Sequence, residues 1–191
     1  QRALAVLRLL GLFDRPATAD CLAALLEPPA IPGLTEVLVG MSEAQRNVAF
    51  TRLATAKLLT VNRDAAGTLV SLDAHPLIRE YFAKRLQTEA PANRAASAPG
   101  FLRRLTRGLT PPGSPGNSPW REAHRRLYEH LCASTKDKPD ATLEDLQPLY
   151  QAVAHGCQAG LQQEVAEKVY YGRIARREEA YAIRKLGAFG S

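Results

Sequence analysis

The sequence has few cysteines, no long apolar run and no phosphate-binding loop. Its three cysteines, Cys21, Cys132 and Cys157, are odd in number and far apart, so they predict neither a disulfide framework nor a CxxC metal site. No apolar run approaches the ~20 residues that cross a bilayer, and no signal-peptide pattern opens the chain, so we expect a cytoplasmic protein without membrane contact. Because the GxxxxGK[ST] motif is missing, we also expect that this chain does not hydrolyse ATP alone.

No group of residues forms a catalytic or metal-binding set by its spacing along the chain. His124 and His130 do not share a helical face well, and His155 and Cys157 point in different directions on a helix. We therefore interpret these residues as surface histidines and a buried thiol. The expectation is a chain that is not an enzyme and has no catalytic residue and no metal ligand.

The overall composition is that of a globular protein. With 191 residues, 46% of them hydrophobic and 23% charged, the chain is long enough for one or two domains with cores of their own. The formal net charge of +6 permits a polyanionic partner, but the basic residues are spread over several segments, which favours a solvated basic surface. The chain starts at Gln1 inside an apolar helical pattern, so we interpret it as a piece of a longer protein.

Three helices are predicted in the first part of the chain, over residues 3–13, 18–26 and 42–58. The first is apolar almost all round, which is typical of a helix at the centre of a domain. The third opens with Ser42 and Gln45, the spacing of a capping box. Its expected core positions are apolar residues at helical spacing: Val48, Phe50, Leu53, Ala54 and Leu58.

The stretch 58–86 carries the strongest pattern of the sequence. Two β-type runs flank a turn at residues 64–67, which predicts a β-hairpin with Leu59 and Val61 on one strand and Leu69 and Leu72 on the other. A His-Pro pair, His75 and Pro76, then starts a helix with an apolar face of Leu77, Ile78, Tyr81, Phe82 and Leu86. Three helices followed by a hairpin is the order of a winged-helix domain.

The rest of the chain divides into a linker and an all-helical region. Proline and glycine recur throughout residues 89–119, which is typical of a linker. Beyond it, helices are predicted over 120–133, 143–159 and 161–173, with very short turns between the last ones. The sequence therefore predicts a mainly α protein with three parts: a winged-helix domain over 1–88, a linker over 89–119 and a helical region over 120–191.

The stretch Asp73-Ala74-His75-Pro76-Leu77-Ile78-Arg79-Glu80-Tyr81 resembles the MHD motif of STAND-class signal-transduction NTPases, which include the NB-ARC and NACHT-like regulators. In that family the motif belongs to a winged-helix domain downstream of the nucleotide-binding core, and its histidine contacts the β-phosphate of bound ADP. The resemblance implies that His75 binds this cofactor. Pro76 departs from the pattern, because aspartate is usual there, but proline suits the first position of a helix.

The stretch from Leu146 to Gly160 resembles a tetratricopeptide-like helical hairpin, with Gly160 at its turn. The match is degenerate, because Gly156 stands where an aromatic residue is common. The resemblance implies a helical arm that binds a protein or peptide ligand. Residues that would contribute to a peptide-binding face are Tyr170, Tyr171, Arg173, Arg176 and Arg177.

Taken together, these resemblances imply a non-catalytic regulatory segment. Its cofactor, ADP or ATP, and its first partner, a nucleotide-binding domain, would belong to the upstream part of the parent protein, which is expected to assemble into oligomers on activation. The alternative is a winged-helix DNA-binding regulator, whose phosphate contacts would come from Arg94, Arg103, Arg104, Arg107, Arg121, Arg125 and Arg126. The predicted third helix carries only Arg46, Arg52 and Lys57 as basic residues, which makes nucleic acid the weaker choice of partner.

Overall fold

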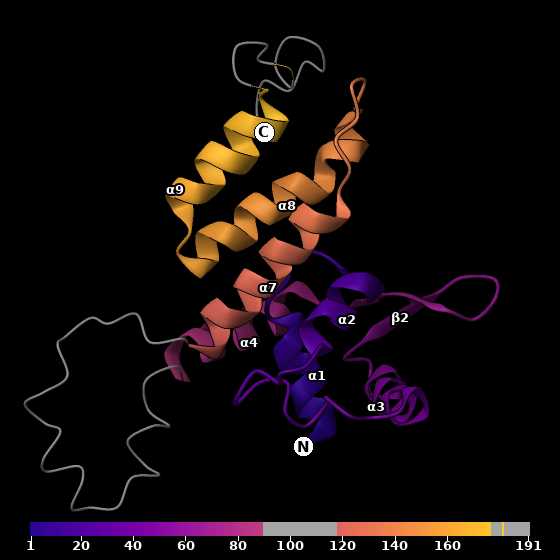
Figure 1. Cartoon of the computed structure of the whole chain (residues 1–191). Helices are drawn as coiled ribbons and strands as arrows, with labels where there is room; N and C mark the ends of the chain where they lie inside the picture. Colours follow the sequence, from indigo (N-terminus) through magenta and orange to yellow (C-terminus); the bar gives the residue numbers. More distant parts are fainter. Residues whose placement is uncertain (90–117, 177–180, 182–191) are drawn as a thin grey trace, which may run out of the picture. The chain divides into compact units, whose positions relative to one another are not determined.

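The computed structural model describes residues 1–89, 118–176 and 181 (Figure 1). The described parts are mainly helical, as the sequence predicts, and they contain a small antiparallel sheet with three strands, one more than the predicted hairpin. The chain forms two compact units, residues 1–122 and 123–191. Most of the linker predicted over 89–119 lies outside the described residues. No helix in the described parts combines the length and the apolar character needed to cross a membrane.

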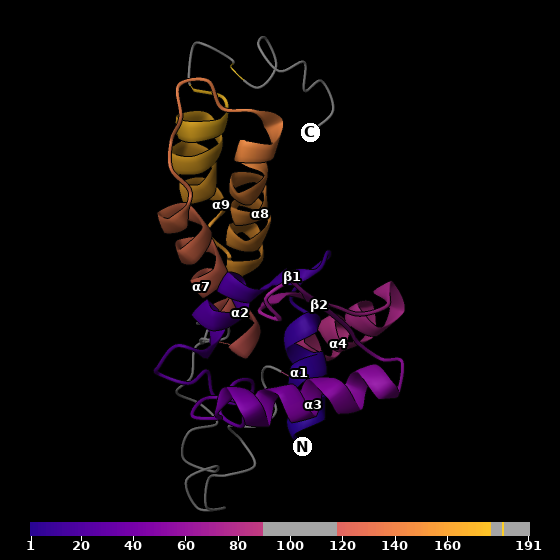
Figure 2. The same ribbon diagram turned by 90° about the vertical axis from the view of Figure 1, so that its right-hand side faces the viewer.

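Helix α1 (Arg2–Leu10) lies at the centre of the first unit and contacts both α3 (Glu43–Thr55) and α4 (Pro76–Glu89). Figure 2 shows α3 crossing α1. The approach of α1 to α4 is close, because a Cβ atom built on Gly11 would lie 2.7 Å from the backbone nitrogen of Ala83. The core around α1 consists of buried aliphatic and aromatic side chains, among them Leu9, Leu10, Leu25, Phe50, Leu53, Leu72 and Phe82.

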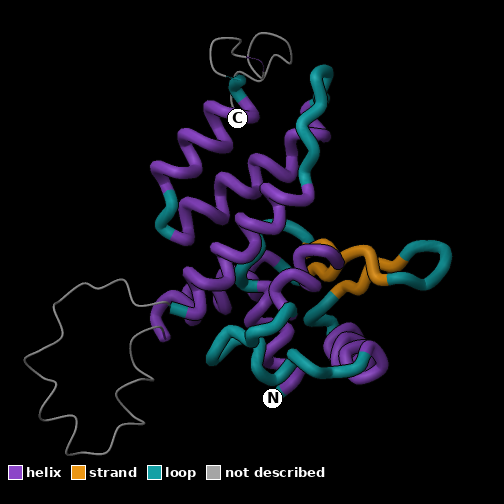
Figure 3. Tube along the Cα trace, viewed as in Figure 1, coloured by secondary structure: helices purple, strands orange, loops and turns teal. Residues whose placement is uncertain are grey.

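The sheet of the first unit has the strand order β1-β3-β2. The central strand β3 (Leu69–Asp73) pairs with β2 (Thr60–Arg63) in the predicted hairpin, whose loop projects away from the helices (Figure 3). Its other edge pairs with β1 (Ala17–Thr18), which directly precedes α2 (Ala19–Leu26). Strand β1 was not predicted, because two residues are too few to show an alternating pattern.

Helix α3 begins with the capping box that the sequence predicts. The Ser42 hydroxyl accepts a hydrogen bond from the backbone N–H of Gln45, and the Gln45 side chain accepts one from the Ser42 backbone N–H. The expected core positions of this helix are only partly correct: Phe50 and Leu53 are buried, but the Val48 side chain is 53% exposed. Two faces of α3 carry apolar side chains, and only one of them packs against the unit.

Helix α4 differs from its prediction in the same way. Phe82 and Leu86, one turn apart, are buried, and α4 packs against α1. Leu77 and Tyr81 were expected on the same apolar face but are 68% and 57% exposed. They precede the buried pair by five residues, so on a helix with 3.6 residues per turn they lie on a different side.

The second unit is built from helices that lie side by side in Figures 1 and 2. Helix α7 (Pro119–Ser134) leads into it, and α8 (Leu143–Ala159) ends at Gly160, which adopts φ +87°. The short α9 (Gln162–Glu164) continues as a π-helix, η1 (Val165–Ile174), which packs along α8. The region predicted as one α-helix over 161–173 is therefore helical, but most of it is wound more widely than an α-helix.

A turn between α8 and η1 brings Gly156 and Val165 together. A Cβ atom on Gly156 would lie 2.2 Å from Val165 Cγ2 and 3.0 Å from Cδ2 of the Tyr128 ring. The space that an aromatic residue would occupy at position 156 is therefore filled by Val165 and by Tyr128 from α7. A side chain larger than that of glycine therefore does not fit at position 156 without displacing these neighbours.

Candidate functional site

His75 lies at the junction between β3 and α4. Its neighbours on the N-terminal side, Leu72 and Ala74, are buried, whereas the His75 side chain is exposed. Strand β3 ends at Asp73 and α4 begins at Pro76, so only two residues connect them. The fold thus places the predicted cofactor-binding residue on the surface of the first unit, at the N-terminus of a helix of 14 residues.

Hydrogen bonds to the first turn of α4 orient this histidine. Its carbonyl oxygen accepts from the backbone N–H groups of Ile78, at 2.9 Å, and Arg79, at 3.2 Å. Its ring atom Nδ1 accepts from the backbone N–H of Leu77 at 3.3 Å. Because Nδ1 is an acceptor in this geometry, the neutral ring carries its proton on Nε2. The exposed side chain therefore offers an N–H donor beside the positive end of the α4 dipole.

Asp73 and Arg79 join the two ends of the junction. The Asp73 atom Oδ1 accepts from the backbone N–H of Ala74 at 2.8 Å and from Arg79 Nη1 at 2.9 Å. The side chains of this ion pair are 37% exposed for Asp73 and 14% exposed for Arg79. One carboxylate oxygen thus links the end of β3 to the second turn of α4. Both residues belong to the motif quoted above, but the sequence did not reveal that they contact each other.

Two exposed apolar side chains follow His75 on α4. Leu77 and Tyr81, one helical turn apart, form a surface that we call the α4 patch. The Tyr81 ring packs edge-on against Phe82, with ring centroids 5.1 Å apart, and its hydroxyl lies 3.4 Å from Arg85 Nη1. These two side chains are exposed, whereas Phe82 and Leu86 of the same helix are buried.

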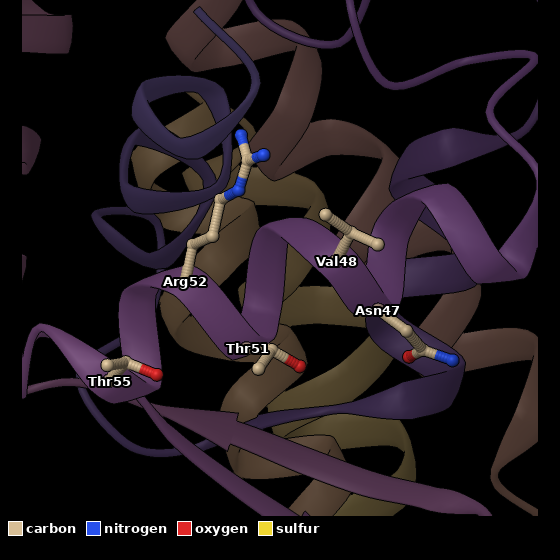
Figure 4. Close-up of a pocket in the computed structure, with 5 residues that line it drawn as sticks. All are labelled: Asn47, Val48, Thr51, Arg52 and Thr55. Atoms are coloured by element: carbon tan, nitrogen blue, oxygen red, sulfur yellow. The ribbon is translucent and has the colours of Figure 1, made fainter.

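The outward face of α3 forms a shallow hollow of about 450 Å³. Figure 4 shows its lining residues along one helix: Asn47, Val48, Thr51, Arg52 and Thr55. Arg63 from strand β2 reaches this face, because its Nη2 atom donates to Asn47 Oδ1 at 2.8 Å. The face is mostly uncharged, and Arg52 is the single charged residue of the lining.

A buried histidine pair lies in the second unit. The Nδ1 atoms of His124, on α7, and His155, on α8, are 2.8 Å apart, so one ring donates and the other accepts. Both side chains are buried, which corrects the prediction of surface histidines, and Cys157, predicted as a buried thiol, is exposed. Burial, together with the charge that His155 can carry, lowers the pKa of His124 to about 3. The two residues are 31 positions apart, so no local spacing indicated their contact.

A second hollow, of about 430 Å³, lies between α7 and η1. Its polar groups are partnered within the unit: Glu164 accepts from Lys168 Nζ at 3.1 Å, and the Tyr128 hydroxyl lies 3.5 Å from the same carboxylate oxygen. Burial is the main cause that raises the pKa of Tyr128 to about 12 and the pKa of the Cys132 thiol above its usual value. These groups are therefore protonated at neutral pH and are not activated nucleophiles.

Two of the arginines expected on a peptide-binding face bind the chain's own backbone instead. Arg173 and Arg176 donate to backbone carbonyl oxygens at the end of α7 and in the following loop, residues 135–141. Arg173 also pairs with Asp137, and the Arg176 guanidinium lies 3.7 Å from the ring centroid of Tyr181. Arg177, the third of these arginines, lies outside the described residues.

Comparisons with known proteins assign no function to this chain. Neither a family model, nor a curated protein sequence, nor a solved structure matches this chain. The arguments for function therefore come from the contacts and the exposure of the residues described above.

Proposed function

We propose that this chain is a regulatory segment of a STAND-class signal-transduction NTPase. In this proposal the first unit is a winged-helix domain that closes over a nucleotide held by a domain outside this chain. The second unit is a tetratricopeptide-like arm that binds a protein or peptide signal. The chain itself carries out no chemical step, and its role is to bias the parent protein between a closed and an open state.

The arrangement of the first unit supports the winged-helix part of the proposal. Its element order is α1, β1, α2, α3, β2, β3, α4, and the antiparallel sheet has the order β1-β3-β2. The three helices α1, α2 and α3 precede the hairpin β2–β3, which is the order on which the winged-helix prediction rests. The hairpin β2–β3 would be the wing, and the His75 junction directly follows it.

The observation that carries the proposal is the exposed His75 side chain with its Nδ1 atom already engaged. This geometry directs an Nε2–H donor outward from a helix N-terminus, an arrangement suited to a phosphate oxygen. Pro76 adds no backbone donor, but the N–H groups at the start of α4 still favour an anion. The α4 patch, Leu77 and Tyr81, would contact the domain that holds the nucleotide.

The signal-binding arm would be built on the hairpin of α8 and η1. Gly160 forms the turn of this hairpin, and Val165, five residues later, packs against Gly156 at a position that alanine usually holds in the repeat pattern. Arg173 and Arg176 are engaged with loop 135–141, so a protein ligand would have to be recognised by other groups. Tyr171, which is exposed on η1, is one of them.

DNA binding remains the second candidate because of the outward face of α3. Asn47 and Arg52 are side chains that read base edges, and Arg63 extends this surface from the hairpin. The distribution of charge argues against DNA binding by the first unit. Residues 1–89 contain ten basic and nine acidic side chains, so they are nearly neutral, whereas residues 90–117 contain four arginines and no acidic residue. A DNA-binding domain is expected to concentrate positive charge on its recognition surface.

The proposal is tested with the longer parent protein and a His75→Ala variant, by calorimetric titration with ADP. The loss of one charge-assisted hydrogen bond is expected to weaken ADP binding about 10- to 100-fold. Lys84→Ala, on an exposed face of the same helix, is the matched control and should leave the affinity unchanged.

Two results would contradict this division of labour. One is an ADP affinity that His75→Ala does not alter, and the other is tight ADP binding by the present chain alone. In parallel, a duplex shift assay at two salt concentrations examines the DNA alternative. Salt-dependent binding by residues 1–89, abolished by Arg52→Ala, would favour that alternative instead.

A further inference from the structure

We infer that Asp73 and Arg79 are positioning residues that hold the His75 ring in its donor orientation. The inference rests on the proposed function, because it concerns the same site, and it assigns a role to two residues that need not touch the nucleotide. It depends on three observations: the shared carboxylate oxygen, the low exposure of the Arg79 side chain and the hydrogen bond to His75 Nδ1.

The first step concerns the backbone on both sides of His75. Asp73 Oδ1 accepts from the N–H of Ala74, so the peptide group that precedes the junction is fixed. The same atom accepts from Arg79 Nη1, so the second turn of α4 is fixed to the end of the strand. Ala74 is buried, which anchors the junction to the core. His75 therefore lies between Ala74 and Arg79, which both donate to the Asp73 carboxylate.

The second step concerns the ring. The Leu77 N–H that donates to Nδ1 belongs to the first turn of α4, which is one of the least constrained parts of any helix. If this turn frays, the Leu77 N–H moves away from Nδ1, and the ring can carry its proton on either nitrogen. The bond from Asp73 to Arg79 spans that turn and thereby keeps the N–H in place.

The third step concerns the charge of Arg79. The Arg79 side chain is only 14% exposed, and its Nη1 atom lies 2.9 Å from the Asp73 carboxylate, so its charge is matched inside the junction. The ion pair between Lys84 and Glu80 on the same helix is different, because these side chains are 72% and 56% exposed. Exposed pairs of that kind contribute little to local order. The Lys84 pair is therefore the natural control for the Asp73–Arg79 pair.

The test is a ¹⁵N NMR measurement of the ring nitrogens of His75 in the present chain at neutral pH. In the wild type we expect the Nε2–H form to dominate. A dominant Nδ1–H form would overturn the inference without any variant, because a protonated Nδ1 cannot accept the hydrogen bond from the Leu77 backbone N–H.

Arg79→Gln and Asp73→Asn are the informative variants. Each should lower the ratio of the Nε2–H to the Nδ1–H form by about two- to tenfold, the range expected for the loss of one hydrogen bond. Lys84→Gln should leave the ratio unchanged. Unaltered ring signals in both folded variants would overturn the inference. If Arg79→Gln does not fold, Arg79→Lys replaces it, with a smaller shift in the same direction expected and an unaltered ratio again contradicting the role.

This readout needs no nucleotide, so it separates the two proposals. If the variants change the ring but His75→Ala leaves ADP binding by the parent protein intact, the positioning role stands and the nucleotide role fails. If His75→Ala weakens ADP binding while Arg79→Gln leaves the ring unchanged, the nucleotide role stands and the positioning role fails.

Discussion

Two histidine sites, one in each unit, lie in opposite environments. His75, in the first unit, is exposed, and the contacts that orient it come from residues within four positions along the chain. His124 and His155, in the second unit, are buried against each other, and their contact joins two helices. The first arrangement leaves a hydrogen-bond donor at the surface, whereas in the second two ring nitrogens hydrogen-bond each other inside a core.

The difference shows how burial separates the roles of one residue type. A buried histidine pair saturates its shared nitrogen atoms internally and contributes to stability at the pH where it is neutral. An exposed histidine with one nitrogen engaged adds little to stability but has a defined donor. We therefore expect substitutions in the second unit to change folding, and substitutions at His75 to change binding.

The largest effects on stability are expected at two glycines, one in each unit, that lie close to a neighbouring element. Gly11→Ala would place a Cβ atom against the backbone of α4, and Gly156→Ala would place one against the buried Val165 side chain. Neither neighbour can move away easily, so each variant should lose about 3 kcal/mol of unfolding free energy.

Amide hydrogen exchange during denaturation would show whether each loss stays within its own unit. Gly172→Ala is the control, because its nearest contact is longer, at 3.3 Å, and a gain in helix propensity offsets it to within about 1 kcal/mol. A uniform loss over both units in both variants would contradict the comparison.

The second prediction uses pH to separate the buried pair from the exposed ring. The pKa of His124 in the folded state is about 3, below its value of about 6.5 in an unfolded chain. The unfolded state therefore binds more protons between these values, so the contribution to stability is complete above pH 6.5 and is lost as the pH falls towards 3.

Urea denaturation of the second unit at several pH values measures this loss, with an expected slope of up to about 1.4 kcal/mol per pH unit. Replacing both histidines, as in His124→Leu with His155→Leu, should flatten the slope. His75→Gln should not change it, and an equal effect of His75→Gln would remove the distinction between the two sites.

The smallest effect compares the capping boxes at the start of α3 and α8. Thr142 and Asp145 repeat in the second unit the arrangement of Ser42 and Gln45 in the first. Ser42→Ala and Thr142→Ala should each reduce the unfolding free energy by about 1 kcal/mol. Thr55→Ala, at the other end of α3, is the control, with an expected change below about 0.5 kcal/mol. Thermal melts resolve this difference, and equal melting temperatures for Ser42→Ala and the wild type would contradict it.

The sequence predicts those parts of the fold whose information is local. Helical periodicity located α3, α7 and α8, and the Ser42 spacing predicted its capping box. Helical periodicity did not predict which apolar side chains are buried. Val48, Leu77 and Tyr81 fit an apolar pattern but face outward. Which of two apolar stripes packs inward depends on the neighbouring elements, and no spacing within one helix contains that information.

The candidate site divides in the same way. His75 was identified from a motif of nine consecutive residues, and the structure places it at the expected strand-to-helix junction. Its pair of supporting residues was part of that motif, but six positions of separation do not indicate a contact when a strand ends between them. The His124–His155 contact required the docking of two helices, so its prediction would have needed the tertiary structure.

The bonds from Arg173, Arg176 and Tyr181 to the loop after α7 also bear on how the protein is made. These donors are synthesised 36 to 40 residues after the loop groups they contact. At about 5 to 20 residues per second, the ribosome needs roughly 2 to 8 s to supply them. During that interval residues 135–141 lack these hydrogen bonds, so the loop completes its contacts only after Arg173, Arg176 and Tyr181 have been synthesised.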